Sequence, residues 1–418
     1  MLHARYDARR MTQTAVAGID SPAAWWRLLA TLVMSTLGGV GMWSVIVVLP
    51  AVQAEFGVDR ATATLPYTVT MIGYGFGGIL MGRLSDRYGV ARPLAGATIA
   101  LATGYFLSAL APSLTIFALA HALLIGFLGS SASFGPLLAD ISHWFERRRG
   151  LAVSIVACGN YLAGTLWPPV VQHLIDTLGW RDTQIAIGAI CLVTMLPLSL
   201  ALRRRPPAVS SGGPAAASTA QPPPTLGISP AALQVLLVVA GLACCVAMSM
   251  PQVHIVAYCG DLGYGPAAGA RMLSLMLGFG IVSRLLSGWI ADHIGGVRTL
   301  LLGSVLQGTA LLLYVPFDGL ASLYIVSALF GLFQGGIVPS YALIIREFFP
   351  PREAGARVGL VMMATLFGMA LGGWMSGLVF DLTGSYRAAF LNGMGWNLLN
   401  LSIAVSLLRL QGPRLARA

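Results

Sequence analysis

The 418-residue sequence lacks lysine altogether, and only 10% of its residues are charged. Its apolar share is 56%, whereas soluble proteins average about 25% charged and about 45–50% apolar residues. Because a single soluble core stops growing near roughly 250–300 residues, a soluble fold could not bury so much apolar surface. The composition predicts a polytopic membrane protein and excludes a soluble enzyme, a disordered regulator and a disulfide-rich scaffold.

The sequence is also poor in groups that bind metals or nucleotides. Its five cysteines lie in or beside apolar runs, without the spacing of metal ligands. We therefore expect neither disulfides nor zinc, and no other cofactor. The glycines of 73–78 lie inside an apolar run, which argues against a nucleotide-binding turn. No separate signal peptide is expected, because the first apolar run is long enough to remain as a membrane span.

Twelve apolar segments are long enough to cross a bilayer, at about 20 residues per helix. Their ranges are 26–52, 61–82, 93–111, 114–139, 150–175, 183–202, 231–257, 267–291, 297–315, 319–345, 355–380 and 387–409. The polar stretch between the sixth and seventh is typical of a flexible linker. The expected parts are a tail (1–25), a six-helix bundle (26–202), a linker (203–230), a second bundle (231–409) and a tail (410–418).

All 25 basic residues are arginines, and they form short clusters between the apolar runs. Nucleic acid is therefore not an expected partner. If both termini are cytoplasmic, twenty arginines fall on the cytoplasmic side. Only four face outward, namely Arg60, Arg181, Arg271 and Arg387. This asymmetry predicts cytoplasmic termini.

Three landmarks recur in the two halves. The sequence GRLSDRYG at 82–89 matches GWIADHIG at 288–295, with the aspartates 292 − 86 = 206 residues apart. Phe145 and Phe349, which precede the fifth and eleventh spans, are 349 − 145 = 204 residues apart. Asp176 and Asp381, which follow these spans, are 381 − 176 = 205 residues apart. The near-constant offset indicates two homologous halves, an architecture in which transporters hold substrate between the halves near the midplane.

The Gly-x-x-x-Asp-Arg-x-Gly turn, the twelve spans and the central linker resemble the major facilitator superfamily. The resemblance covers essentially the whole chain and implies an all-α membrane protein, with twelve transmembrane helices in two pseudo-symmetric six-helix bundles. It also implies a cytoplasmic gating latch, although these charges could instead only set topology. The candidate gating and turn residues are Gly82, Asp86, Arg87, Gly89, Arg147, Arg148 and Asp292. Gly82 and Gly89 would permit a tight turn.

A narrower resemblance is to monocarboxylate transporters and the related oxalate–formate exchangers. It is carried by WFERRR at 144–149, by GWR at 179–181 and by IVSR at 281–284. It implies that an arginine in the eighth span binds the substrate carboxylate, and Arg284 occupies that place. Animal monocarboxylate transporters have an aspartate one turn earlier, where this chain has Gly280, and a lysine in the first span, which is missing here.

Arg284 is the one arginine far from a predicted span end. A central arginine costs at least about 2.5–3.5 kcal/mol to insert, and no aspartate or glutamate lies in the middle of a span to compensate. A guanidinium matches the two oxygens of a carboxylate, so we expect a small organic anion as the ligand. One fixed charge favours a monoanion over a dianion. The alternative is an arginine bonded to backbone carbonyls at a broken helix.

The proton-coupling candidates are His254, His121 and Asp140. Asp140 is also expected to pair with the cluster Arg147–Arg149. Alternatively, a weak acid and Arg284 suffice together, and the carboxylate enters with a proton carried by His254 or by water. Polar and aromatic residues inside spans are candidates to shape the pocket beside Arg284. They are Trp43, Asn160, Tyr161, His254, Gln334 and Tyr341.

Together these features predict a transporter rather than an enzyme. We expect a monomer in a bacterial inner membrane that moves a small organic monocarboxylate by alternating access, with proton coupling. Anion exchange of the oxalate–formate type and efflux of other small molecules are the alternatives. A membrane enzyme or a sensor would need a metal cluster, a nucleophile with a base or a soluble domain, and the sequence suggests none of these.

Overall fold

The computed structural model describes residues 19–204 and 226–415. Of the expected tails and linker, 1–18, 205–225 and 416–418 lie outside the described residues. The first described helix begins at Pro22, inside the expected tail, and the last extends to Leu415, beyond the expected end of its span. Throughout the described ranges the secondary structure is helical, without strands, which confirms the all-α class.

Among the described residues, the first half contains twelve helical elements. They are α2 (Pro22–Gly38), α3 (Val40–Phe56), α4 (Arg60–Ala63), α5 (Leu65–Tyr88), α6 (Ala91–Ala109), α7 (Leu114–Leu119), the π-helix η1 (Ala120–Gly129), the 3-10 helix η2 (Ser130–Ser133), α8 (Gly135–Ile141), α9 (Arg149–Ala157), α10 (Gly159–Leu178) and α11 (Trp180–Ala201).

The second half contains seven. They are α12 (Pro230–Asp261), α13 (Pro266–Ile294), α14 (Gly296–Leu313), α15 (Leu320–Gln334), α16 (Ile337–Phe348), α17 (Pro351–Thr383) and α18 (Tyr386–Leu415).

Nine helical stretches in the described residues are long and apolar enough to cross a membrane. Some combine several elements, as α2 and α3 do between Pro22 and Phe56. The nine match nine of the expected spans. Helices α5, α6 and α18 occupy the places of the other three, at 61–82, 93–111 and 387–409, but are not among the nine. Membrane crossing therefore stays a prediction for these three helices.

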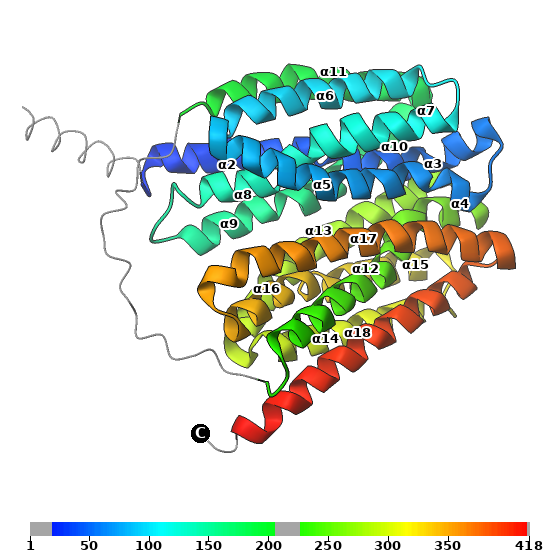
Figure 1. Ribbon diagram of the computed structural model, residues 1–418. Coiled ribbons are helices and arrows are strands. Elements are labelled where there is room, and N and C mark those ends of the chain that lie inside the picture. The colour runs from blue at the N-terminus through cyan, green and yellow to red at the C-terminus, as the bar shows by residue number, and fades with distance from the viewer. Residues whose placement is uncertain (1–18, 205–225, 416–418) are drawn as a thin grey trace, which may run out of the picture.

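Figure 1 shows the helices of the first half in the upper part of the molecule and those of the second half in the lower part. The start of α2, the turn between α5 and α6 and the end of α11 lie at the left end in this view. We call this end the arginine-rich end and the opposite end the arginine-poor end. The halves meet where α10 packs on α13 and where α5 packs on α17.

The repeated sequence motif forms a matching helix end in each half. Gly89 follows α5 with a φ of +78°, and Gly295 follows α13 with a φ of +82°. These backbone angles favour glycine, so both glycines are needed for the turns. Gly82, in contrast, lies inside α5, and its expected role in the turn is wrong. Only the residue just after the helix takes the left-handed conformation.

Candidate functional site

Arg284 lies on α13 at the contact between the two halves. Its Nη1 donates a hydrogen bond to the carbonyl of Ala157 over 3.2 Å, at the break between α9 and α10. Its guanidinium carbon lies 4.4 Å from the ring centroid of Tyr161 on α10, a cation–π geometry. The Nε atom of Arg284 is buried and has no hydrogen-bond partner among the described residues. The carbonyl contact expected as the alternative is thus present, while part of the guanidinium remains free.

No carboxylate neutralises Arg284 within the described ranges. The described ion pairs are Arg27–Asp140, Arg60–Asp261, Arg181–Glu55, Arg357–Glu353 and Arg387–Asp318. A partly buried cation at the contact between the halves is costly without an ion pair, so the site favours an anion that arrives from outside the protein.

Trp43 and Asn160 extend this site on the first half. The indole Nε1 of Trp43 donates to the backbone oxygen of Asn160 at 3.2 Å and lies 3.3 Å from its side-chain oxygen. Asn160 precedes Tyr161, so α3 and α10 together hold the ring that supports Arg284. The structure therefore brings together four of the expected residues, which we call the arginine cluster: Trp43, Asn160, Tyr161 and Arg284.

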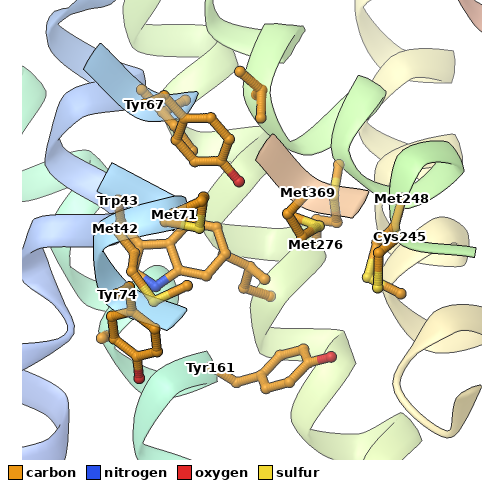
Figure 2. Packing of buried hydrophobic residues seen from close by; sticks show 14 of the residues in the cluster. Met42, Trp43, Tyr67, Met71, Tyr74, Tyr161, Cys245, Met248, Met276 and Met369 are labelled. Atoms are coloured by element: carbon orange, nitrogen blue, oxygen red, sulfur yellow. The ribbon is translucent and has the colours of Figure 1, made fainter. Parts of the chain in front are cut away.

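Methionines line the interior beside the arginine cluster. Figure 2 draws Met71, Met276 and Trp43 within one cluster of buried side chains. Met71 and Met276 are fully buried, and Met42 and Met369 nearly so, on α5, α13, α3 and α17 respectively. These residues escaped the sequence analysis because a methionine in an apolar span gives no local signal. Their flexible thioethers can adapt to apolar groups of different shapes.

Gln334 lies at the end of α15, near the helix that carries Arg284. The next residue, Gly335, donates its backbone N–H to the hydroxyl of Ser283 at 3.0 Å, and Ser283 precedes Arg284. The amide of Gln334 is completely buried, and both its polar atoms are without a partner among the described residues. Burying an amide without a hydrogen bond costs free energy, which suggests a partner that is not part of the protein.

Tyr341 and the two histidines are placed elsewhere. The hydroxyl of Tyr341 donates to Asn400 at 3.0 Å inside the second half. His254 lies 2.8 Å from the carbonyl of Gly373 through its Nε2. His121 lies in the first half, with its Nδ1 3.1 Å from the carbonyl of Phe117. The described contacts of these three residues do not include the arginine cluster.

Asp140 does not pair with the cluster Arg147–Arg149, and that expectation is wrong. Its carboxylate instead accepts two hydrogen bonds from the guanidinium of Arg27, at 2.8 and 2.9 Å, and both side chains are buried. Arg27 also donates to the carbonyl of Leu202 at 3.1 Å. The pair joins α2 to α8 because helix packing brings their ends together across 113 residues of sequence.

The expected gating residues lie at the arginine-rich end. Gly82, Asp86, Arg87 and Gly89 line a pocket of about 940 Å³ there. Asp86 and Asp292 are exposed and make no hydrogen bond or ion pair with other described residues. The backbone N–H of Arg147 donates to Asp20 at 3.1 Å, and the guanidinium of Arg148 lies 5.9 Å from the ring of Trp25. The expected latch is therefore not closed by these side chains in this structure.

At the arginine-poor end, Arg60 ties the halves together. Its guanidinium pairs with Asp261 of α12 at 3.1 Å. The carboxylate of Asp381 in α17 accepts from the backbone N–H groups of Arg60 and Ala61, at 3.0 and 2.7 Å. The preceding residue, Asp59, caps α4, and hydrogen bonds from Thr62 lower the pKa of this carboxyl group. The sequence predicts only that Arg60 faces outward, and it gives no sign of these contacts.

Comparisons with known proteins agree with this architecture. The sequence matches the profile described as Major Facilitator Superfamily over residues 31–322 and 282–417. It is 30% identical over 349 residues to "Monocarboxylate transporter 13" of Bos taurus, covering 79% of this chain and 77% of that protein. It is 24% identical to the "Uncharacterized MFS-type transporter YhjX" of Escherichia coli, covering 81% of this chain and 84% of the relative.

Solved structures share the fold at low sequence identity. A bacterial homolog to the human lysosomal transporter Spinster, in an inward-facing and occupied conformation, superimposes with a TM-score of 0.71 at 14% identity. That match covers 93% of this chain and 98% of the other. A mutant of the peptide transporter POT gives a TM-score of 0.72 at 14% identity, with 96% and 99% covered.

Proposed function

Because the chain belongs to the major facilitator superfamily, we propose that it is a secondary active transporter of a small organic monocarboxylate, coupled to a proton. The observation that carries the proposal is Arg284, which lies between the halves without an acidic partner among the described residues. Its guanidinium can offer paired N–H donors to a carboxylate. The relatives named monocarboxylate transporters support the same substrate class.

The surroundings of Arg284 suit a substrate with one charged group and an apolar body. Tyr161 supports the guanidinium, while buried methionines such as Met71 and Met276 lie in the interior nearby. The free amide of Gln334 can bond a second polar group of the substrate. A second carboxylate would find no further cation in the arginine cluster, so monoanions are favoured.

Alternating access requires that the halves separate at one end and then at the other. We assign the arginine-rich end to the cytoplasmic side of a bacterial inner membrane. The protein acts there as a monomer. Opening the arginine-poor end must then break the contacts of Arg60 with Asp261 and Asp381. Substrate binding at Arg284 biases the equilibrium between the two states only by its different affinity for them.

In this proposal the proton enters with the monoanion through water and not on a protein side chain. His254 is bonded to Gly373, and Asp140 to Arg27. Neither contacts the arginine cluster, and Gly280 replaces the aspartate found in animal relatives. A monoanion bound at Arg284 and a proton delivered by water together make uptake depend on the pH gradient without a dedicated titratable side chain of the protein.

The test uses the purified full chain in liposomes. A thermal-shift screen against short, branched and aromatic monocarboxylates selects a ligand, whose uptake is then measured under an imposed pH gradient and by counterflow. We expect uptake in both assays, and Arg284→Gln should abolish anion binding and transport. The matched control is Arg271→Gln, which removes an exposed arginine from the same helix and should leave uptake near wild type.

Unchanged uptake in Arg284→Gln would refute its role, and uptake of no carboxylate would refute the proposal. The two assays also separate the alternatives. Uptake that requires an internal anion and ignores the pH gradient would indicate exchange of the oxalate–formate type.

A further inference from the structure

The pocket of about 940 Å³ at the arginine-rich end is separate from the arginine cluster. The described residues that line it all belong to the first half, from the start of α2, the end of α5, the start of α6, α8 and the end of α11. Four exposed arginines line it, namely Arg87, Arg92, Arg203 and Arg204. None of the four forms an ion pair with a described residue.

The charges around this pocket do not balance. Arg27 and Asp140 also line it but neutralise each other in a buried pair. Among the described residues of the lining, Asp86 is then the one remaining carboxylate, against four guanidinium groups without an ion pair. The pocket has room for an anion and an excess of groups that bind one.

The start of α6 adds a further attraction for an anion. Val90 and Ala91, where this 19-residue helix begins, are part of the pocket wall. No side chain caps the first backbone N–H groups of α6. Uncapped N–H groups and the helix dipole favour a negative group at such a position.

Membrane orientation alone does not account for this number of arginines. At the repeat offset of 206 residues, Arg92 and Arg203 correspond to Arg298 and Arg409. His293 and Leu410 stand where the first half has Arg87 and Arg204. At these four corresponding positions the second half therefore holds two fewer guanidinium groups, although the superfamily architecture places them on the same membrane side.

We propose that this pocket binds a phosphate group, with Arg92, Arg203 and Arg204 as its ligands. Guanidinium groups match phosphate oxygens in pairs, and basic pockets at this membrane depth suit anionic lipid headgroups. Leu200 lines the pocket and is 44% exposed, and Val193 on the same helix is 71% exposed. This apolar surface runs from the pocket along α11, so an anionic phospholipid can place its headgroup at the arginines and its chains on the helix.

The test measures binding to the purified full chain, independently of transport. One arm titrates fluorescent phosphatidylglycerol, with phosphatidylcholine as the neutral comparison. The other arm follows the thermal midpoint of delipidated protein with inorganic phosphate. We expect phosphatidylglycerol to bind more tightly than phosphatidylcholine, and Arg92→Gln/Arg204→Gln to weaken that binding at least about tenfold. Higher ionic strength should weaken it further in the wild type.

The control is Arg298→Gln/Arg409→Gln, which removes two arginines from the corresponding positions of the second half. It should bind like the wild type. A phosphate-induced shift without lipid preference would support the site with free phosphate as its ligand. Equal affinity for both lipids together with no phosphate shift would overturn the proposal, as would an equal loss in the control. If the double variant does not fold, the single variants Arg92→Gln and Arg204→Gln are each compared with the wild type for their affinity for phosphatidylglycerol.

Discussion

Asp381 of the second half holds Arg60 of the first, because its Oδ1 accepts the backbone N–H of Arg60 at 3.0 Å. Its other oxygen accepts the N–H of Ala61 at 2.7 Å. The side chain of Arg60 turns to Asp261, and its guanidinium carbon lies 5.0 Å from the ring of Phe380. One short segment thus makes charged and backbone contacts with two helices of the other half.

The substitution Asp381→Asn should loosen the arginine-poor end. It removes the charge that strengthens two hydrogen bonds, so the population open at that end should rise about tenfold. Spin labels introduced by Ala54→Cys and Thr383→Cys in a cysteine-free background would report the distance between the halves. The control Asp318→Asn breaks a pair with Arg387 inside the second half and should not change this distance. An unchanged distance distribution in Asp381→Asn would show that the hydrogen bonds of Asp381 do not hold the arginine-poor end closed.

Replacing Tyr161 tests the ring below Arg284. Tyr161→Phe keeps the ring and should transport like the wild type. Tyr161→Leu removes the cation–π contact, so the apparent KM should rise roughly twofold to thirtyfold, the range that corresponds to about 0.5–2 kcal/mol. Initial uptake rates over a range of substrate concentrations measure the effect. Equal KM values for the two variants would show that the ring does not position the guanidinium.

The pair Arg27–Asp140 should contribute to stability through its burial. Asp140→Asn leaves Arg27 buried without a counter-charge, which should lower the free energy of unfolding by about 3–5 kcal/mol. Arg27→Met/Asp140→Leu removes both charges and should recover most of this loss. Thermal unfolding of the solubilised full chain ranks the variants. Glu353→Gln, in a more exposed pair, should cost less than about 1 kcal/mol. A double variant no more stable than the single one would contradict this reasoning.

His254→Gln should retain uptake that depends on the pH gradient. The histidine bonds the carbonyl of Gly373 and lies 3.5 Å from the hydroxyl of Tyr386, so its contacts are within the second half. Glutamine can replace one of these hydrogen bonds but cannot carry a proton. Uptake of the selected monocarboxylate at several imposed gradients is the measurement. Loss of the pH dependence with binding intact would make His254 the proton carrier.

The candidate site was predictable in part. Arg284 stands out in the sequence because a charge in an apolar span is a strong local signal. Asn160 and Tyr161 are predictable because they are a polar and an aromatic residue inside an apolar span. The carboxylate of Asp140 was assigned to nearby arginines in the sequence, whereas its partner is 113 residues away. Arg60 gave no sign of its two acidic partners, which lie more than 200 residues further along the chain.

The sequence by itself determined the helical membrane class, the repeat of two halves and the isolated charge at Arg284. These properties depend on hydropathy, on residue spacing and on the scarcity of charge, all of which are local or additive along the chain. Only the tertiary structure decided that Tyr161 lies under Arg284, that Arg27 neutralises Asp140 and that Arg60 joins the two halves. Such contacts arise when helices far apart in sequence pack against one another, and no spacing of residues encodes which side chains then meet.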